Sequence, residues 1–341
     1  MKVTILGATG KTGQSIVDAL LESGIDFEIT ALTRPSSIDK PEAEALRNRG
    51  VKTVAVDLAS LPASPTLYGD KPAAADPELV RILTGIDVVI STTFFMNLSE
   101  QIPLVDAAKA AGVGRFIPCN FQTVAPRGVM ALSDAKYAIL DHIQRVRQPY
   151  TTIDVGWWYQ LSLPRVPSRR LNGNSERELT GTGTSNASSL LYLPAGEVIA
   201  GGGAPSAMTD LRDVGRFVAL IITDERTINK TVFAWGEVAT QTEVGEMVER
   251  LAGEAPMWTE LSANTLDARI AQLPAEQQHV VSVSLTLLDY QRSWGARGDN
   301  TPENAKYLGF LSARELYPEF KPVSLERFVR EALEAGATAA K

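Results

Sequence analysis

Cysteine and histidine are scarce in this sequence of 341 residues, which contains one cysteine and two histidines. Cys119 has no second cysteine with which to form an intramolecular disulfide. His142 and His279 lie far apart in the sequence, and neither has a cysteine nearby that would help to complete a tetrahedral zinc site. We therefore expect a protein of a reducing compartment that holds no metal ion.

Long apolar runs and an excess of positive charge are also missing. No window approaches the roughly 18 consecutive apolar residues of a membrane helix, and Met1 and Lys2 lead directly into the strand-like VTIL rather than into a signal peptide. The formal net charge of −7 disfavours the clustered Lys and Arg that bind nucleic acids and anionic membranes. We expect a cytoplasmic protein whose partner is a small-molecule substrate, with no nucleic acid and no membrane. Nothing in the sequence sets the oligomeric state.

Strand and helix patterns alternate over the first 155 residues. β-branched runs predict strands over 3–6, 27–33, 51–58, 87–92, 115–120 and 150–156. Helical patterns between them cover 11–24, 41–49, 78–85, 99–112 (opened by Ser99) and 133–147. This alternation predicts an α/β fold in which residues 1–155 form a Rossmann-type, doubly wound parallel sheet.

The second half of the chain departs from this pattern. It predicts a helix over 210–222, a strand over 231–235 and a helix near 241–252, followed by mainly helical structure. We expect residues 156–341 to form a smaller α/β substrate domain, with some segments packing back on the first domain.

Two long loops interrupt these elements. The proline-rich stretch 61–77 either borders the site or decorates the surface. The stretch 164–189, rich in Ser, Asn, Gly, Thr and Arg, is either a lid over a substrate pocket or a mobile surface loop.

A glycine-rich turn joins the first predicted strand to the first predicted helix. In a Rossmann-type domain the first glycine makes the tight turn, the second lets backbone amides approach a pyrophosphate, and the third allows close helix packing. Gly7, Gly10 and Gly13 of the segment GATGKTG stand where these roles require them. The predicted cofactor contacts of this turn are Gly7, Thr9, Gly10, Lys11, Thr12 and Gly13.

The same segment contains GKT, so a nucleoside-triphosphate loop is an alternative. In that loop the spacer between the first glycine and the glycine before the lysine is longer than the pair Ala8 and Thr9 found here. We therefore interpret Lys11 as a side chain at the start of the helix, near the phosphates of a dinucleotide. The glycine spacing is similar to that of short-chain dehydrogenases.

The end of the second predicted strand indicates which dinucleotide binds. NAD enzymes usually have an acidic residue there, whereas ALTRPSS supplies a guanidinium and hydroxyl groups, which suit a 2′-phosphate. The sequence thus favours NADPH, the alternative being that Arg34 is only a solvated loop residue. The predicted contacts at this end of the cofactor are Arg34, Ser36, Ser37 and Lys40.

Residues at the ends of three further strands complete the predicted cofactor site. Asp57 and Leu58 end the third strand, where a Rossmann chain approaches the adenine, although Asp57 is equally explained as a helix cap or turn residue. Thr92 and Thr93 end the fourth strand, and Cys119 ends the fifth.

Large apolar side chains also gather at the carboxyl ends of predicted strands, where open α/β sheets bind ligands. Taken singly, each is more often a core residue than a ligand contact. Their clustering leads us to predict a pocket for an aromatic or polycyclic molecule. The predicted pocket residues are Phe94, Phe95, Met96, Phe121, Trp157, Trp158 and Tyr159.

Short-chain dehydrogenases commonly pair a catalytic tyrosine with a lysine four residues later, and that pair is missing here. The one literal match, Tyr317 and Lys321, lies near the C-terminus with Pro318 inside the would-be helical turn, so we reject it. What remains is Lys136, in SDAKYAILDHIQRV on the helix after the fifth strand. Composition alone favours a surface position for this lysine.

Several strings together resemble the NmrA-like group of atypical short-chain dehydrogenases, and within it the isoflavone reductase and phenylcoumaran benzylic ether reductase branch. The resemblance covers about residues 1–160 well and about 195–255 moderately. It rests on Lys136 and on GATGKTG, TRPSS, FIPCNFQ, PYTTIDVGWW and DLRDVGRFVALIITDERTINKTV.

The resemblance implies an NADPH-dependent reductase of secondary metabolism, in which Lys136 contacts the nicotinamide ribose and serves as general acid or base. An ordinary lysine pKa near 10.4 would require burial or a neighbouring positive charge to support proton transfer near neutrality. The family string has a serine, an acid and a glycine where this sequence has Cys119, Asn120 and Gln122. The identity of the substrate is therefore not inferred from the family.

We expect hydride transfer to a small apolar molecule that is an enone, imine, ketone or benzylic ether. Two alternatives stay open. One is an NADP(H)-sensing regulator that binds a protein partner without turnover. The other is an isomerase or cyclase that retains the cofactor.

Overall fold

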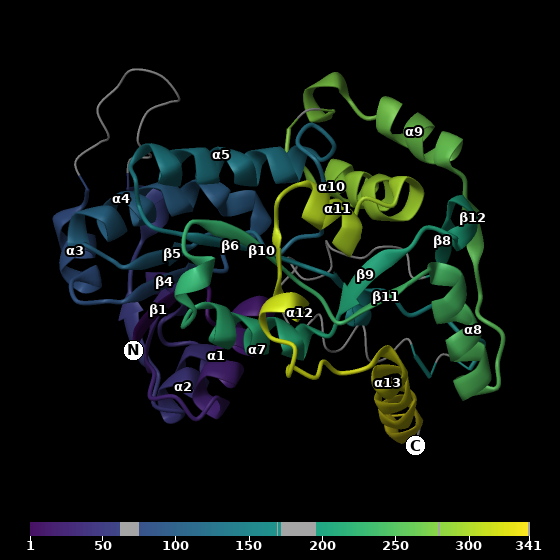
Figure 1. Ribbon diagram of the computed structural model, residues 1–341, viewed down its shortest axis with the longest axis horizontal. Helices are drawn as coiled ribbons and strands as arrows, with labels where there is room; N and C mark the ends of the chain where they lie inside the picture. The colour runs from purple at the N-terminus through teal and green to yellow at the C-terminus, as the bar shows by residue number, and fades with distance from the viewer. Residues whose placement is uncertain (62–74, 169, 172–195, 279, 340–341) are drawn as a thin grey trace. The chain divides into compact units, whose positions relative to one another are not determined.

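A computed structural model describes residues 1–61, 75–168, 170–171, 196–278 and 280–339 (Figure 1). Most of both expected long loops, 61–77 and 164–189, lies outside these ranges, and neither interpretation of either loop is tested. No helix in the described ranges is both long and apolar enough to span a bilayer.

The chain divides into two compact units, each built from separate segments. Unit 1 comprises Met1–Phe121, Asp134–Ile153 and Val214–Val232, and unit 2 comprises Gln122–Ser133, Asp154–Asp213 and Phe233–Lys341. Val214–Val232, from the second half of the sequence, thus belongs to unit 1, and Gln122–Ser133, from the first half, belongs to unit 2.

Unit 1 contains a five-stranded parallel sheet in the order β3-β2-β1-β4-β5. Its strands are β1 (Lys2–Leu6), β2 (Glu28–Thr33), β3 (Lys52–Ala55), β4 (Val88–Ser91) and β5 (Arg115–Ile117). The order reverses between β1 and β4, which is the topological switch point of a doubly wound sheet. The predicted fold class is confirmed.

Helices cover both faces of this sheet. In Figure 1, α1 and α2 lie on one side of the strands, and α3, α4 and α5 lie on the other. Their bounds are α1 (Lys11–Glu22), α2 (Pro41–Asn48), α3 (Pro77–Leu83), α4 (Gln101–Ala111) and α5 (Ala131–Arg145). Ser99 does not open α4, because a 3-10 segment, η3 (Phe95–Glu100), precedes that helix.

The sixth predicted strand does not join the five-stranded sheet and contacts its edge strand β5 through a single bridge. β6 (Thr151–Val155) follows one isolated bridge between Phe116 and Tyr150, and then pairs in a second sheet of order β13-β10-β6. The other strands of that sheet are β10 (Lys230–Ala234) and β13 (Leu311–Ser312). The prediction that the fifth strand extends to residue 120 was wrong, because β5 ends at Ile117.

Two interactions fix the segment 214–232 within unit 1. The helix α7 (Leu211–Ile221) packs on α1 at Gly215, whose backbone N–H donates to Ser15 Oγ at 2.9 Å. Arg115 is buried, and its Nη1 donates to the carbonyl of Ile221 at 2.6 Å and to Thr227 Oγ1 at 3.0 Å. A buried guanidinium with these partners holds β5 to the end of α7.

Gly215→Ala is expected to destabilise the protein. The added Cβ would lie 1.9 Å from the carbonyl oxygen of Ser15, so α1 and α7 would have to separate. Such overpacking destabilises the folded protein by about 3 kcal/mol. The better helix propensity of alanine stabilises it by about 1 kcal/mol. We expect a net loss of about 2 kcal/mol in the free energy of unfolding, measured by chemical denaturation.

The control for this prediction is Gly203→Ala, because no atom lies within 4 Å of the Cβ added at Gly203. Its free energy of unfolding should stay within about 0.5 kcal/mol of the parent. Equal stability of the two variants would show that the close contact between α1 and α7 is wrong.

Unit 2 combines short strands with the C-terminal helices. One sheet has the order β11-β9-β7, and β8 pairs with β12. The strands are β7 (Trp157–Trp158), β8 (Glu197–Ile199), β9 (Ser206–Thr209), β11 (Glu237–Ala239) and β12 (Thr259–Leu261). The helices are α8 (Gln241–Ala252), α9 (Ala263–Ala271), α10 (Val283–Tyr290), the π-helical turn η9 (Gln291–Arg297), α11 (Pro302–Tyr307), α12 (Ala313–Leu316) and α13 (Leu325–Ala339).

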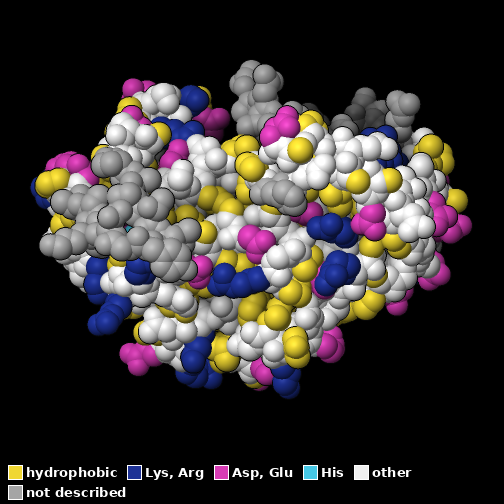
Figure 2. Space-filling view, turned by 90° about the horizontal axis from the view of Figure 1, so that it is seen from above, with side chains coloured by type: hydrophobic (Ala, Val, Ile, Leu, Met, Phe, Trp, Pro, Cys, Tyr) yellow, Lys and Arg dark blue, Asp and Glu magenta, His cyan; other side chains and the backbone are white. Residues whose placement is uncertain are grey.

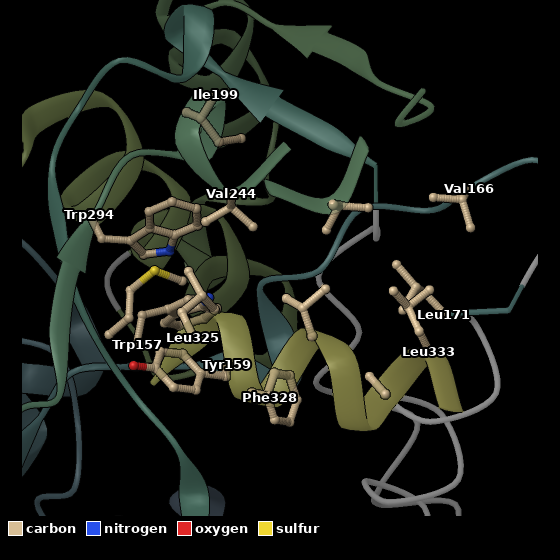
Figure 3. Packing of buried hydrophobic residues seen from close by; sticks show 14 of the residues in the cluster. Trp157, Tyr159, Val166, Leu171, Ile199, Val244, Trp294, Leu325, Phe328 and Leu333 are labelled. Carbon is tan, nitrogen blue, oxygen red and sulfur yellow. The ribbon is translucent and has the colours of Figure 1, made fainter. Parts of the chain in front are cut away.

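The core of unit 2 is built around aromatic residues from distant parts of the sequence. Figure 3 shows Trp157 and Tyr159 close to Trp294 and to Phe328 of α13. The indoles of Trp157 and Trp294 stack with ring centroids 5.3 Å apart, and the rings of Tyr159 and Phe328 lie 5.6 Å apart. Aromatic pairs at these distances stabilise the unit beyond their buried area.

Candidate functional site

The glycine turn forms a cradle at the switch point that has no room for side chains. Gly7 adopts a positive φ of +81°, and a Cβ there would lie 2.6 Å from the carbonyl oxygen of Thr92. A Cβ on Gly13 would lie 2.3 Å from the carbonyl oxygen of Gly7. The Gly10 N–H donates to that same oxygen at 2.9 Å and closes the turn. Gly7 and Gly13 therefore leave no room for a Cβ, and Gly10 closes the turn through its backbone.

The cradle ends at the N-terminus of α1. Gly10 is the N-cap residue, and no described side chain caps this helix. Backbone N–H groups at a helix N-terminus form a favourable site for an anion. The first turn of α1, which includes Lys11 and Thr12, therefore suits the pyrophosphate of a dinucleotide.

The end of β2 carries the predicted phosphate-binding group. Arg34 follows β2 and is 53% exposed, and its Nη2 lies 3.2 Å from Glu100 Oε1. Asn97 Nδ2 donates to the same carboxylate oxygen at 2.8 Å. Ser36 and Ser37 lie in the next turn, η1 (Pro35–Ser37), and Lys40 is the exposed N-cap residue of α2. Sequence reasoning missed Glu100, which orients the guanidinium.

The end of β3 leads into a short 3-10 turn. Asp57 begins the 3-10 turn η2 (Leu58–Ser60) without capping it by its side chain, and its carbonyl oxygen accepts from Ser60 Oγ at 2.9 Å. Leu58 is buried. Asp57 is thus a turn residue in this structure, and its carboxylate takes no part in capping.

Lys136 is a buried residue of unit 1. Its side chain is on α5 and only 5% exposed, and its ammonium donates a hydrogen bond to the carbonyl oxygen of Asn120. A buried ammonium needs such a partner, because burial without one is costly. The structure therefore excludes the surface position that composition alone favours.

The chain after β5 is bent so that Asn120 can meet Lys136. Phe121 has a φ of +37°, which is a strained conformation for a bulky residue, and its N–H donates to the carbonyl of Ile153 at 2.8 Å. The Cys119 N–H donates to Gln101 Oε1 at 2.8 Å, and Cys119 Sγ donates to the carbonyl of Thr93 at 3.1 Å. The first of these bonds joins Cys119 to α4, and the second links the segments that follow β4 and β5.

The predicted aromatic pocket residues fall in both units. Phe94 and Phe95 of unit 1 have ring centroids 4.6 Å apart, and Met96 beside them is exposed. Trp157, Trp158 and Tyr159 belong to unit 2. Tyr159 is fully buried, and its ring centroid lies 5.6 Å from that of Phe328. Burial also raises the pKa of its hydroxyl, which disfavours it as a proton donor.

The charge distribution is mixed on the face shown in Figure 2, where Lys and Arg side chains are interspersed with Asp and Glu. Among the described residues, no three His, Cys, Asp or Glu side chains gather closely enough to hold a metal ion.

A glycine cradle at the switch point and a buried lysine after β5 match the expected family. The chain matches the NmrA-like family over residues 1–328. This chain belongs to the NmrA-like family. The family resemblance predicted from the sequence is confirmed.

Curated relatives of this NmrA-like protein include dehydrogenases and reductases. It is 40% identical to the asnovolin J 5′,6′-dehydrogenase of Aspergillus novofumigatus, over 98% of this chain and 96% of that one. It is 26% identical to the phenylcoumaran benzylic ether reductase Betv6 of Betula pendula, over 97% and 98% of the two chains. The NmrA-like protein is an oxidoreductase, as predicted.

A solved structure agrees with the fold. The binary complex of leucoanthocyanidin reductase with NADPH from Vitis vinifera aligns with a TM-score of 0.74 at 20% identity, covering 98% of this chain and 100% of that one. The predicted Rossmann-type fold is thereby confirmed.

The thiol of Cys119 is held in its neutral form in this NmrA-like protein. Burial raises the pKa of Cys119, and the nearby Lys136 ammonium offsets part of that rise. Because the pKa is above its ordinary value, the thiolate fraction is low at neutral pH and increases only at more alkaline pH. Cys119 is therefore poorly suited to act as a nucleophile.

We expect iodoacetamide to alkylate Cys119 more slowly than a peptide cysteine between about pH 7 and pH 9. In Lys136→Met the offsetting positive charge is gone, so the pKa of Cys119 should rise and the midpoint of the rate–pH profile should move to higher pH. Mass spectrometry follows the reaction directly, since the chain has a single cysteine. A midpoint that stays in place or falls in the variant would contradict the proximity of the two groups.

Proposed function

We propose that this NmrA-like protein is an NADPH-dependent reductase that transfers hydride between the nicotinamide and a small apolar, ring-containing molecule. The observation that carries the proposal is the buried Lys136 after β5, in the same unit as the glycine cradle at the end of β1. The reacting group of the substrate would be an enone, imine, ketone or benzylic ether. We also propose a cytoplasmic location and a role in secondary metabolism.

The residues of unit 1 fit the proposed cofactor. The cradle from Gly7 to Gly13 excludes side chains and presents the N-terminus of α1, as a pyrophosphate requires. Arg34, with Ser36, Ser37 and Lys40, would bind the 2′-phosphate at the end of β2. The adenine and nicotinamide ends would contact Asp57, Leu58, Thr92, Thr93, Cys119 and Lys136. When bound, NADPH supplies the hydride.

Lys136 would supply the proton or positive charge that balances the hydride. The carbonyl oxygen of Asn120 accepts one of its hydrogen bonds and fixes the ammonium. An ammonium held in a low-dielectric environment stabilises negative charge that develops on a substrate oxygen, and it can donate a proton there. Asn120 thus acts as a positioning residue through its backbone.

The names of the relatives support the proposed substrate class and bear on the direction of the reaction. The Aspergillus relative is named for dehydrogenation of asnovolin J, and the Betula relative for reduction of a benzylic ether. We therefore propose that the reaction is measurable in both directions, with NADPH consumed in reduction and NADP⁺ consumed in dehydrogenation.

The test is a change in nicotinamide absorbance across a panel of neutral cyclic enones, imines, ketones and benzylic ethers, with their saturated counterparts and NADP⁺ for the reverse direction. We expect turnover with at least one class, and at least a tenfold preference for NADPH over NADH, about 1.4 kcal/mol. Tight NADPH binding without turnover in any class would contradict a reductase and favour the sensor alternative.

A further inference from the structure

The segment after β5 that binds Lys136 is itself anchored by a side chain from α4. Gln101 is the first residue of α4 and is 1% exposed. Its Oε1 accepts from the backbone N–H of Cys119 at 2.8 Å, and its Nε2 donates to the carbonyl oxygen of Leu98 at 3.4 Å. Cys119 directly precedes Asn120, whose carbonyl oxygen accepts from the Lys136 ammonium. Gln101 therefore fixes the chain one residue before the acceptor of the lysine.

This segment needs such anchors because its backbone is strained. Phe121 has a φ of +37°, which a bulky residue keeps where the surrounding structure holds it there. The Phe121 N–H donates to the carbonyl oxygen of Ile153 at 2.8 Å, and Cys119 Sγ donates to that of Thr93 at 3.1 Å. Both of these acceptors are backbone atoms, whereas Gln101 contributes a side chain that a substitution can remove. Without it the Cys119 N–H loses its acceptor, which disfavours the present conformation.

The helix that carries Gln101 is joined to the helix that carries Lys136. Asp106 on α4 and His142 on α5 are both buried, and His142 Nε2 lies 2.7 Å from Asp106 Oδ1. Both helices belong to unit 1 and lie on the same side of the five-stranded sheet in Figure 1. A buried hydrogen bond of this kind resists displacement of the helices, because its loss where water is scarce is costly. Thus α4 holds both the helix of the lysine and the segment that contains its acceptor.

We propose that Gln101 is a positioning residue that sets the place of the Lys136 ammonium. It holds Cys119 so that the carbonyl oxygen of Asn120 meets the ammonium. The consequence for catalysis rests on the proposed function, in which Lys136 supplies a proton or a positive charge. A displacement of about 1 Å can lower the rate of a reaction by about 100-fold. Gln101 thus affects the chemical step through Lys136 rather than through the substrate.

Gln101→Met is expected to lower kcat at least about tenfold, while KM stays within about threefold, because the displacement affects the reacting group. Methionine retains much of the volume of glutamine but is a poor acceptor for the Cys119 N–H. In the Lys136→Met background the same substitution should change kcat less than about twofold, because the lysine that it positions is absent. Gln101→Asn, whose amide is one methylene further from Cys119, should give the same pattern if Gln101→Met does not fold in thermal unfolding.

Gln148→Met is the matched control. Gln148 is another buried glutamine of unit 1, and its Nε2 donates to the carbonyl oxygen of Val113 at 2.9 Å. It lies beyond the end of α5 at Arg145, which is about 14 Å along the helix from Lys136. The substitution should lower the free energy of unfolding but leave kcat within about twofold. An equal loss of kcat in Gln148→Met and Gln101→Met would overturn the proposal.

A second readout needs no turnover, because the pKa of Cys119 responds to the Lys136 ammonium. Lys136→Met should raise the midpoint of the rate–pH profile for iodoacetamide in the parent protein. In the Gln101→Met background, where the ammonium is no longer held, Lys136→Met should raise the midpoint by less than about half as much. The direct effect of Gln101 on the thiol cancels, because the effect of the lysine is compared in two backgrounds.

An equal shift of the alkylation midpoint in the two backgrounds would overturn the proposal, as would an equal effect of Gln101→Met on kcat with and without Lys136. A smaller shift in the Gln101→Met background supports it. Alkylation requires neither substrate nor cofactor, so this result is distinct from a failure of the nicotinamide assay.

Discussion

Lys136→Met is expected to lower kcat by about 100-fold to 10,000-fold, the range that a general acid or base contributes. Methionine keeps much of the apolar volume of the lysine stem but removes the ammonium that Asn120 holds. Because the glycine cradle and Arg34 are unchanged, the Kd for NADPH should rise far less than kcat falls, by about tenfold, which corresponds to one lost charge-assisted hydrogen bond of about 1.5 kcal/mol. Steady-state kinetics and a cofactor titration on the same preparation separate the two quantities.

Lys109→Met is the matched control for this variant. Lys109 on α4 also donates to a backbone carbonyl, that of Arg147 at 2.8 Å, but it is exposed. Its loss should leave kcat within about twofold, in keeping with the small effects of surface substitutions. Lys136→Arg adds a second readout, because arginine keeps the charge but does not release a proton near neutrality. A kcat for Lys136→Met above half that of the parent would show that Lys136 takes no part in the chemical step.

Arg34→Ala is expected to reduce the preference for NADPH over NADH by about 10-fold to 100-fold. Charge-assisted hydrogen bonds contribute about 1.5–3 kcal/mol each, and only NADPH carries the 2′-phosphate that would receive them. Glu100 accepts hydrogen bonds from Nη2 of Arg34, so the other N–H groups of the guanidinium can donate to the 2′-phosphate. The Kd values of both cofactors, measured by fluorescence titration, give the change in preference.

The control for Arg34 is Arg49, another half-exposed arginine of unit 1 with one carboxylate partner, Asp18, at 2.6 Å. Arg49→Ala should leave the cofactor preference unchanged within about twofold. If Arg34→Ala weakens NADPH and NADH equally, the guanidinium stabilises the protein or the pyrophosphate rather than the 2′-phosphate.

Local physical patterns explain why much of unit 1 was predictable from the sequence. The glycine turn is set by steric contacts within a few residues, such as the approach of Gly13 to Gly7. Short β-branched runs between amphipathic segments likewise predict buried parallel strands without any long-range information. The first five predicted strands and the helices between them were therefore found, with errors mainly at their ends, as at Ser99 and Ile117.

Interactions between residues distant in sequence were not predictable from one chain. Arg34 meets Glu100 across 66 positions, and Arg115 meets Thr227 across 112, and neither pair leaves a local pattern. The pairing of β6 with β10 and the assignment of 214–232 to unit 1 depend on such contacts. The contact of Tyr159 with Phe328 in the last helix likewise leaves no local pattern.

The most direct test of the central proposal is transfer of deuterium from NADPH in which both hydrogens on the hydride-donating nicotinamide carbon are replaced by deuterium, so that either face of the ring delivers label. The enzyme is incubated with labelled NADPH and a substrate from the panel, and the product is analysed by mass spectrometry and NMR. We predict one deuterium per product molecule, on the carbon that accepts the hydride, at an initial rate that falls with kcat in Lys136→Met. Product without deuterium, or labelling that proceeds equally fast in Lys136→Met, would contradict this proposal.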